Sequence, residues 1–304
     1  MLAMRSLTGR LAAIQPPARG AAWMLLAAAL FAVMITLIRH LTDSLHPFQV
    51  AFLRNLFGLL FLLPWLARVG IGALRTQRLR LHFLRAGTGV VGMLCWFSAL
   101  AMMPLGEAVA LSFTSPLFAS VLAAMVLREA AGPRRWLAIC VGFLGALVIL
   151  RPGVTAFTPA ALLVLASSCT FAISVVLVKL LLRTDSPNAA VMYMTLFLTP
   201  ISLPMAALVW QWPDWQTLGI AAALGAVASS AHLCFAHALK LADASAVMPL
   251  DFARLPLTAL IAYFAFGERV DLWIWVGAGI IAASAVYITR HEARAARQAP
   301  AGAA

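Results

Sequence analysis

Hydrophobic residues occur along this chain in runs of about 20, and short polar stretches separate the runs. About 20 apolar residues are needed for a helix to cross the hydrocarbon core of a membrane. The runs lie at residues 21–39, 48–67, 83–102, 106–127, 134–150, 158–180, 188–210, 216–239, 244–266 and 271–289. They predict an all-α membrane protein of ten transmembrane helices with no separate soluble domain.

Composition and charge support a membrane protein. The 304 residues are 63% hydrophobic and 11% charged, and the mean hydropathy is +0.97. A soluble domain carries about 25% charged residues. The net charge of +12 would suggest nucleic acid as the partner of a soluble protein. Here the basic residues gather in loops and tails, so we expect membrane lipid and no nucleic acid as partner.

The basic residues also predict the orientation of the chain. Lys and Arg are concentrated in alternate loops and in both tails, which is typical of the cytoplasmic side. Both termini on one side require an even number of spans, which ten satisfies. We therefore expect cytoplasmic tails at residues 1–20 and 291–304, in a multi-pass protein of the bacterial inner membrane.

The two halves of the chain resemble each other at an offset of 140 residues. The offset pairs three prolines and one cation of the first half with residues of the second: Pro47 with Pro187, Pro64 with Pro204, Pro116 with Pro256 and Arg39 with Lys179. Each repeat, 21–150 and 158–290, holds five spans. Because five is odd, the second repeat is inverted relative to the first, as in many secondary transporters.

This organisation resembles the EamA-type members of the drug/metabolite transporter superfamily. The residues that carry the resemblance are Pro116 and Glu129 in the first repeat, Pro256 and Glu268 in the second, and Arg54. It covers residues 20–290 and implies a ten-helix transporter of small solutes. Members of that superfamily export amino acids and other metabolites, take up nucleotide-like cofactors or expel drugs, so the resemblance does not identify a substrate.

Two charged residues lie inside the ninth run. Asp251 and Arg254 are three positions apart and share a helix face, between Pro249 and Pro256. A charge at mid-membrane costs roughly 2.5–3.5 kcal/mol on insertion scales. Neither charge has a counterpart in the first repeat. We interpret Asp251 and Arg254 as substrate-binding residues, and the alternative is a self-neutralising pair that fixes helix packing.

Arg54 and Asn55, in the second run, are further candidates for the substrate site. A guanidinium offers a fork of donors suited to carboxylate or phosphate. The alternatives for Arg54 are an ion pair with Glu107 and a position at the membrane interface. Arg54 and Arg254 against Asp251 leave a positive excess, which favours a substrate with an anionic group.

Trp96, Phe113 and His232 are candidates to line the same site, with helix packing as the alternative for each. His titrates near neutrality, so His232 joins Asp251 and Glu107 as a candidate proton carrier. His232 and His237 do not share a helix face, and the four Cys residues show no metal-ligand or disulfide spacing. We therefore expect no metal and no cofactor.

The sequence thus predicts a secondary transporter that works by alternating access around a site built by helices 2, 3, 4, 8 and 9. It contains no GxxxxGK[ST] loop and no HExxH or Ser-His arrangement, so we expect neither ATP hydrolysis nor an enzyme. The main hypothesis is export of an amino-acid-like or other carboxylate-bearing metabolite. Uptake or exchange of a nucleotide-like cofactor, drug efflux and a non-transporting scaffold or sensor are the alternatives. A monomer and a homodimer both remain open.

Overall fold

The computed structural model describes residues 16–126, 133–150, 158–242 and 247–298, and this part of the chain is helical without a strand. The elements of the first half are α2 (Pro16–Thr42), α3 (Pro47–Val69), η1 (Ile71–Leu74), α4 (Leu79–Met102), α5 (Leu105–Ser112), α6 (Ser115–Val126) and α7 (Pro133–Leu150). Those of the second half are α8 (Pro159–Leu181), α9 (Pro187–Ala207), α10 (Trp215–Leu241), η2 (Met248–Ala253), α12 (Arg254–Phe266) and α13 (Leu272–Gln298).

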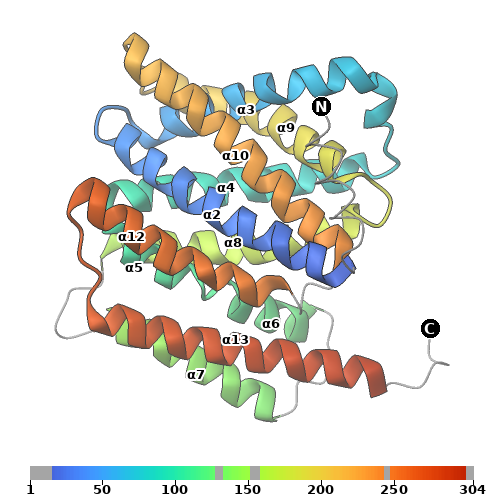
Figure 1. Cartoon of the computed structure of the whole chain (residues 1–304), viewed down its shortest axis with the longest axis vertical. Helices are drawn as coiled ribbons and strands as arrows, with labels where there is room; N and C mark the ends of the chain where they lie inside the picture. Colours follow the sequence, from blue (N-terminus) through green and yellow to red (C-terminus); the bar gives the residue numbers. More distant parts are fainter. Residues whose placement is uncertain (1–15, 127–132, 151–157, 243–246, 299–304) are drawn as a thin grey trace, which may run out of the picture.

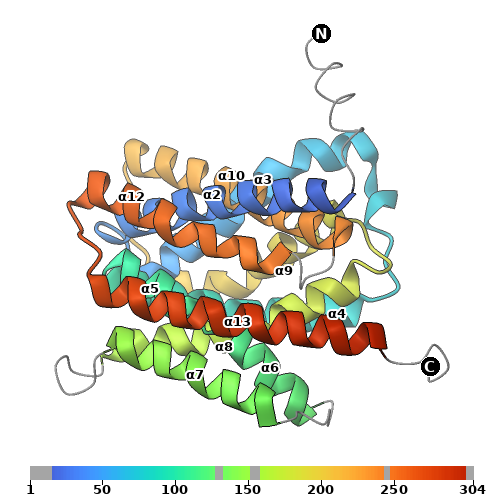
Figure 2. The same cartoon turned by 60° about the horizontal axis from the view of Figure 1, so that its bottom comes forward.

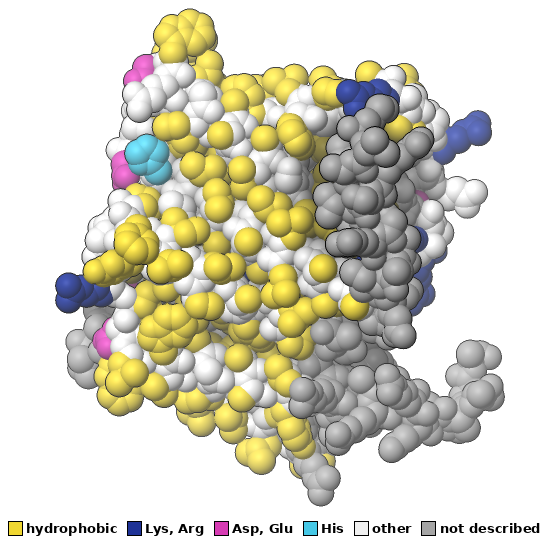
Figure 3. All heavy atoms as spheres, in the orientation of Figure 1, with side chains coloured by type: hydrophobic (Ala, Val, Ile, Leu, Met, Phe, Trp, Pro, Cys, Tyr) yellow, Lys and Arg dark blue, Asp and Glu magenta, His cyan; other side chains and the backbone are white. Residues whose placement is uncertain are grey.

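Ten apolar segments match the ten expected spans. Seven helices are long and apolar enough to cross a membrane by length and composition, and three shorter apolar helices lie at Leu105–Ala119, Trp136–Leu150 and Leu272–Ile288. Figure 3 shows hydrophobic side chains spread over one face of the bundle, with charged side chains toward its left and right margins. The predicted all-α membrane fold is confirmed.

The main helix contacts join one half of the chain to the other. α2 packs along α10, α4 along α8, α7 along α13 and α3 along α9. Figures 1 and 2 show α7 and α13 side by side at one edge of the bundle, and Figure 1 shows α2 between α10 and α12. Under the 140-residue offset α2 corresponds to α8 and α4 to α10, so the pair α2–α10 corresponds to the pair α8–α4. The pairs α3–α9 and α7–α13 each correspond to themselves. The arrangement agrees with the predicted pair of inverted repeats.

The paired cations Arg39 and Lys179 make equivalent contacts. Arg39 donates from Nη1 to the carbonyl of Leu100 near the end of α4 (2.8 Å). Lys179 donates from Nζ to the carbonyl of Leu239 near the end of α10 (2.8 Å). Positive charge at a helix C-terminus is favourable because the last carbonyls lack helical donors. Each cation therefore caps the third long helix of its own repeat.

The fourth and ninth spans are broken at equivalent positions. In the fourth span α5 ends at Ser112 and α6 begins at Ser115, one residue before Pro116. In the ninth span the 3-10 helix η2 gives way to α12 two residues before Pro256. A proline removes a backbone donor and its ring clashes with the carbonyl four residues earlier. Each of these spans therefore consists of two short helical pieces.

Loops expected on the same side of the membrane meet at the same end of the bundle. At one end, the Gln49 side chain exchanges two hydrogen bonds with the backbone of Gln211 (2.6 and 3.0 Å). There too, the Leu105 amide at the start of α5 donates to Glu268 (2.9 Å). Glu129, the predicted counterpart of Glu268, lies outside the described residues, as do residues 1–15 and 299–304. The cytoplasmic placement of the termini and the tail boundaries stay predictions.

Candidate functional site

A cavity of about 170 Å³ lies between the two repeats. A single water needs roughly 10–15 Å³ of such space, so a small organic molecule can enter it. α2, α3, α4, α5, α8, α9, α10 and α12 all contribute lining side chains. The polar and charged ones are Arg54, Arg85, Thr88, Ser112, Ser167, Ser168, Thr170, Ser174, His232 and Arg254. The sequence predicted a site built by spans 2, 3, 4, 8 and 9, and spans 1, 6 and 7 also border this cavity.

One continuous stripe of α4 forms a wall of the cavity. Its lining residues recur at the spacing of a single helix face: Arg85, Thr88, Gly89, Gly92, Met93, Trp96 and Phe97. Trp96 lies eleven positions after Arg85, which is about 16 Å along a helix. Gly92 lets α8 approach closely, because an added Cβ would lie 2.2 Å from Oγ1 of Thr170. The cavity is therefore elongated, with a guanidinium toward one end of α4 and aromatic rings toward the other.

Both broken spans border the cavity. Pro116 cannot donate to the carbonyl of Ser112. The hydroxyl of Ser168 on α8, which donates to the Val164 carbonyl at 2.9 Å, lies 3.4 Å from that carbonyl of Ser112. At the other break, Arg254 is the first residue of α12 and lines the cavity. Irregular backbone at membrane depth is tolerated where it lines a cavity or is buried in protein. The two breaks thus place backbone groups and one charged side chain at the interface of the repeats.

Asp251 and Arg254 form an ion pair, which is the contact that the packing alternative of the sequence analysis described. Nη2 of Arg254 donates to Oδ2 of Asp251 (2.7 Å). The guanidinium lies over the rings of Phe31 and Phe113, 5.5 Å from each centroid, which favours a cation. Oδ1 of Asp251 and Nε of Arg254 are buried and have no hydrogen-bond partner in the described structure. Arg254 lines the cavity, whereas Asp251 and Phe113 contact Arg254 and are not among the lining residues.

Arg54 and Asn55 also lie together. Nη1 of Arg54 donates to Oδ1 of Asn55 (2.7 Å), and the Asn55 amide contacts the sulfur of Met93 (3.4 Å) and the hydroxyl of Ser202 (3.5 Å). Arg54 lines the cavity, and the fully buried Asn55 holds it against α4 and α9. No ion pair joins Arg54 to Glu107 in the described part of the chain.

Arg85 is the charged lining residue that the sequence analysis did not predict. It is 6% exposed, and its Nη1 donates to the carbonyl of Ala190 on α9 (2.7 Å). Its Nη2 contacts the sulfur of Met194 (3.4 Å), and its Nε is buried without a partner among the described residues. Arg85 stands near the start of an apolar run, where basic residues usually belong to a loop. The stripe of Thr88, Gly89 and Gly92 that continues from it is the signal that could have revealed it.

The other predicted residues are divided between the cavity and its surroundings. Trp96 and His232 line the cavity, and the His232 ring packs edge-on against Phe31 at 5.2 Å. Glu107, in the first turn of α5, is not among the lining residues. The proton-carrying roles of Asp251, Glu107 and His232 stay predictions. The described residues contain no group of His, Cys, Asp and Glu that could hold a metal ion.

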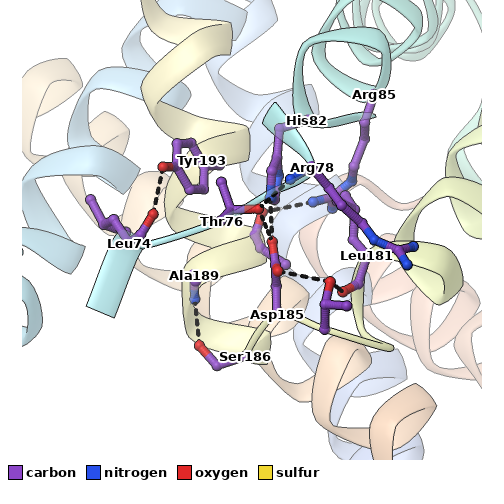
Figure 4. Close-up of polar contacts among 12 residues, drawn as sticks. Leu74, Thr76, Arg78, His82, Arg85, Leu181, Asp185, Ser186, Ala189 and Tyr193 are labelled. Carbon is purple, nitrogen blue, oxygen red and sulfur yellow. Dashed lines mark hydrogen bonds and ion pairs between the residues drawn. The ribbon is translucent and has the colours of Figure 1, made fainter. Parts of the chain in front are cut away.

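A second buried polar group, here called the Asp185 cluster, joins the repeats away from the cavity lining. Figure 4 shows the side chains of Thr76 and His82, from the first repeat, converging on Asp185 between α8 and α9. Oδ2 of Asp185 accepts from Thr76 (2.8 Å) and meets Nε2 of His82 (2.8 Å), and Oδ1 accepts from Thr184 (2.9 Å). Burial raises the pKa of Asp185, but the hydrogen bonds from His82, Thr76 and Thr184 outweigh it and leave the pKa below its ordinary value.

Known proteins resemble this chain over nearly its whole length. The model of the EamA-like transporter family matches residues 18–151 and 158–290. A riboflavin transporter of Vibrio cholerae is 36% identical over 93% of this chain and 96% of its own. An S-adenosylmethionine uptake transporter of Rickettsia prowazekii is 31% identical over 90% and 93%. A pseudopaline exporter of Pseudomonas aeruginosa is 24% identical over 87% and 94%. The family match confirms the predicted resemblance and indicates a transporter, not an enzyme.

Proposed function

Because this chain belongs to the EamA-like transporter family, we propose that it takes up a flat heteroaromatic cofactor of the riboflavin kind by alternating access. Transport of a small molecule is common to the named relatives. The observation that carries the finer proposal is the cavity between the repeats, with aromatic rings beside a row of hydroxyls. Aromatic side chains stack on flat rings, and hydroxyls both donate and accept hydrogen bonds.

The proposal departs from the main hypothesis of the sequence analysis, which favoured export of an amino-acid-like metabolite. The relatives that are 36% and 31% identical are named for riboflavin and for uptake of S-adenosylmethionine, both larger than an amino acid and both heteroaromatic. The pseudopaline exporter is the more distant relative at 24% identity. These names support the alternative of a nucleotide-like cofactor, and the bacterial relatives support the inner membrane as the location.

Both breaks support alternating access. In transporters with inverted repeats, discontinuous helices form the substrate site near the midplane, and the repeats rock around it. Here Ser112 precedes the first break and Arg254 follows the second, and both line the cavity. The main helix packing joins the two repeats, so a rearrangement of these contacts would change the access of the cavity that lies between them.

Uptake into proteoliposomes tests the function. We expect saturable uptake of labelled riboflavin, inhibited by excess unlabelled riboflavin and not by amino acids. Trp96→Leu should lower riboflavin uptake several-fold because it removes a flat ring from the cavity wall. Trp212→Leu is the matched control, since Trp212 is 89% exposed between α9 and α10. Flux of amino acids without flux of riboflavin would favour the metabolite exporter instead.

A further inference from the structure

The cavity carries an excess of positive charge. Arg54, Arg85 and Arg254 line it, and none of its lining residues within the described ranges is acidic. All three guanidinium groups lie within electrostatic range of His232. Arg254 has Asp251 as its counter-ion at 2.7 Å. The excess therefore belongs to Arg54 and Arg85.

Arg54 and Arg85 bond neutral groups. The acceptor of Arg54 is the amide oxygen of Asn55, and those of Arg85 are the backbone carbonyl of Ala190 and the sulfur of Met194. No described acidic residue forms an ion pair with either arginine. Removing a charge from water costs several kcal/mol unless a counter-charge and hydrogen bonds replace the water. An incoming anion would supply both.

Arg85 is the better placed of the two to meet such an anion. Its Nη1 is fixed to α9 through Ala190, which holds the guanidinium in one place. Its Nη2 faces only a thioether, which is a weak acceptor on a flexible side chain. Its Nε has no partner within the described structure. A carboxylate or phosphate oxygen would displace the Met194 sulfur and form the stronger, charge-assisted bond.

The position of Arg85 along α4 indicates how long the bound solute is. Arg85 and Trp96 lie on one stripe of the cavity wall, about 16 Å apart along the helix axis. A solute that spans this stripe has a flat ring at the Trp96 end and its other end at Arg85. We infer that Arg85 binds an anionic end group, phosphate or carboxylate, of an elongated heteroaromatic solute whose ring packs at the Trp96 end of the cavity. This inference rests on the proposed function and selects the anionic member of the substrate class.

Equilibrium binding to the purified full-length protein tests the inference, with riboflavin, flavin mononucleotide and inorganic phosphate as probes. The two flavins share a ring and differ by one phosphate. We expect the wild type to bind flavin mononucleotide at least about tenfold more tightly than riboflavin, the size of one charge-assisted bond. Inorganic phosphate alone should bind much more weakly than flavin mononucleotide, because it lacks the ring.

Variants of Arg85 separate the effect of its charge on flavin binding from any effect on folding. Arg85→Gln should bring the affinity ratio of the two flavins close to one, and Arg85→Lys should keep part of the preference. Arg183→Gln is the matched control, because it removes a charge from an exposed loop residue. The wild-type ratio needs no variant, so a variant that fails to fold does not remove the test.

The failures of the two proposals are distinguishable. Equal affinity for both flavins in the wild type, or an unchanged ratio in Arg85→Gln, would overturn the role of Arg85, while riboflavin uptake would still support the proposed function. Equal affinity for inorganic phosphate and flavin mononucleotide would also overturn it, because the site would then bind an anion without any contribution from the flavin ring. Absence of binding and uptake of either flavin would overturn the proposed function, and this inference with it.

Discussion

Asp185 and Asp251 are equally buried, 7% and 6% exposed, but their hydrogen-bonding partners differ. Thr76, His82 and Thr184 occupy both oxygens of Asp185. Asp251 has Arg254 on one oxygen, and the other is buried without a partner in the described structure. Buried polar groups that serve the fold alone are usually satisfied. Both oxygens of Asp185 therefore hold one arrangement of the repeats, although Nδ1 of its partner His82 is also buried without a partner among the described residues, whereas one oxygen of Asp251 is left to accept a new donor.

The largest effect is expected from Arg254→Ala. The substitution leaves Asp251 buried without its counter-ion and removes a cation from the cavity. We expect a loss of about 3–5 kcal/mol in the free energy of unfolding, as for other broken buried pairs, and a loss of transport. Thermal unfolding in detergent and uptake into proteoliposomes measure the two quantities.

A double variant, Arg254→Met with Asp251→Leu, separates the two losses. Apolar residues of similar volume can replace a buried ion pair at little or no cost in stability. We therefore expect the double variant to recover most of the stability and none of the transport. Transport at the wild-type rate in the double variant would make the pair a packing element, which is the alternative that the sequence left open.

A smaller effect is expected from Asp185→Ala. The substitution removes the acceptor that Thr76, Thr184 and His82 share, and the loss of hydrogen bonds to a charged group costs about 2–3 kcal/mol. The midpoint of thermal unfolding should fall, while the affinity ratio of the two flavins should stay at its wild-type value. Ser186→Ala, which removes only the N-terminal cap of α9 (3.1 Å to the Ala189 amide), is the neighbouring control. Loss of flavin binding at unchanged stability would contradict the structural role of Asp185.

The smallest effect is a pH dependence of the Asp185 cluster. The pKa of Asp185 is lower in the folded protein than its ordinary value, so the folded state favours the ionised carboxylate. Its stabilising contribution is therefore complete above the ordinary carboxyl pKa, about 3.9, and is lost as pH falls through the lower, folded pKa. The difference in Tm between the wild type and Asp185→Asn should shrink by a few degrees from pH 6 to pH 3. A constant difference over that range would contradict the assignment.

The fold could be predicted because its signals are periodic and long. Runs of about 20 apolar residues and paired prolines at a constant offset indicated the ten spans and the repeat, and the structure has both. The shape of the broken spans was harder to predict from the sequence. Pro116 and Pro256 lie beside the breaks, but whether a helix bends or divides at a proline depends on residues far along the chain, such as Ser168, whose hydroxyl lies 3.4 Å from the carbonyl of Ser112.

The site could be predicted in part, and charge was the informative signal. Asp251, Arg254 and Arg54 stood out because a charged residue inside an apolar run is costly. Arg85 did not stand out, because it lies near the start of its run. Phe113 was placed in the cavity wall, whereas it packs on the Arg254 guanidinium. Aromatic residues are common in apolar runs, so their orientation could not be derived from the sequence.

The pairing of helices across the two repeats has a consequence for synthesis. α2 and α4 pack most extensively on α10 and α8, which the ribosome makes only after the whole first repeat. When residue 150 has been added, the faces of α2 and α4 that meet these helices are still covered by lipid or by other proteins of the insertion machinery. The first five helices can therefore reach their final packing only after the second half of the chain has been inserted.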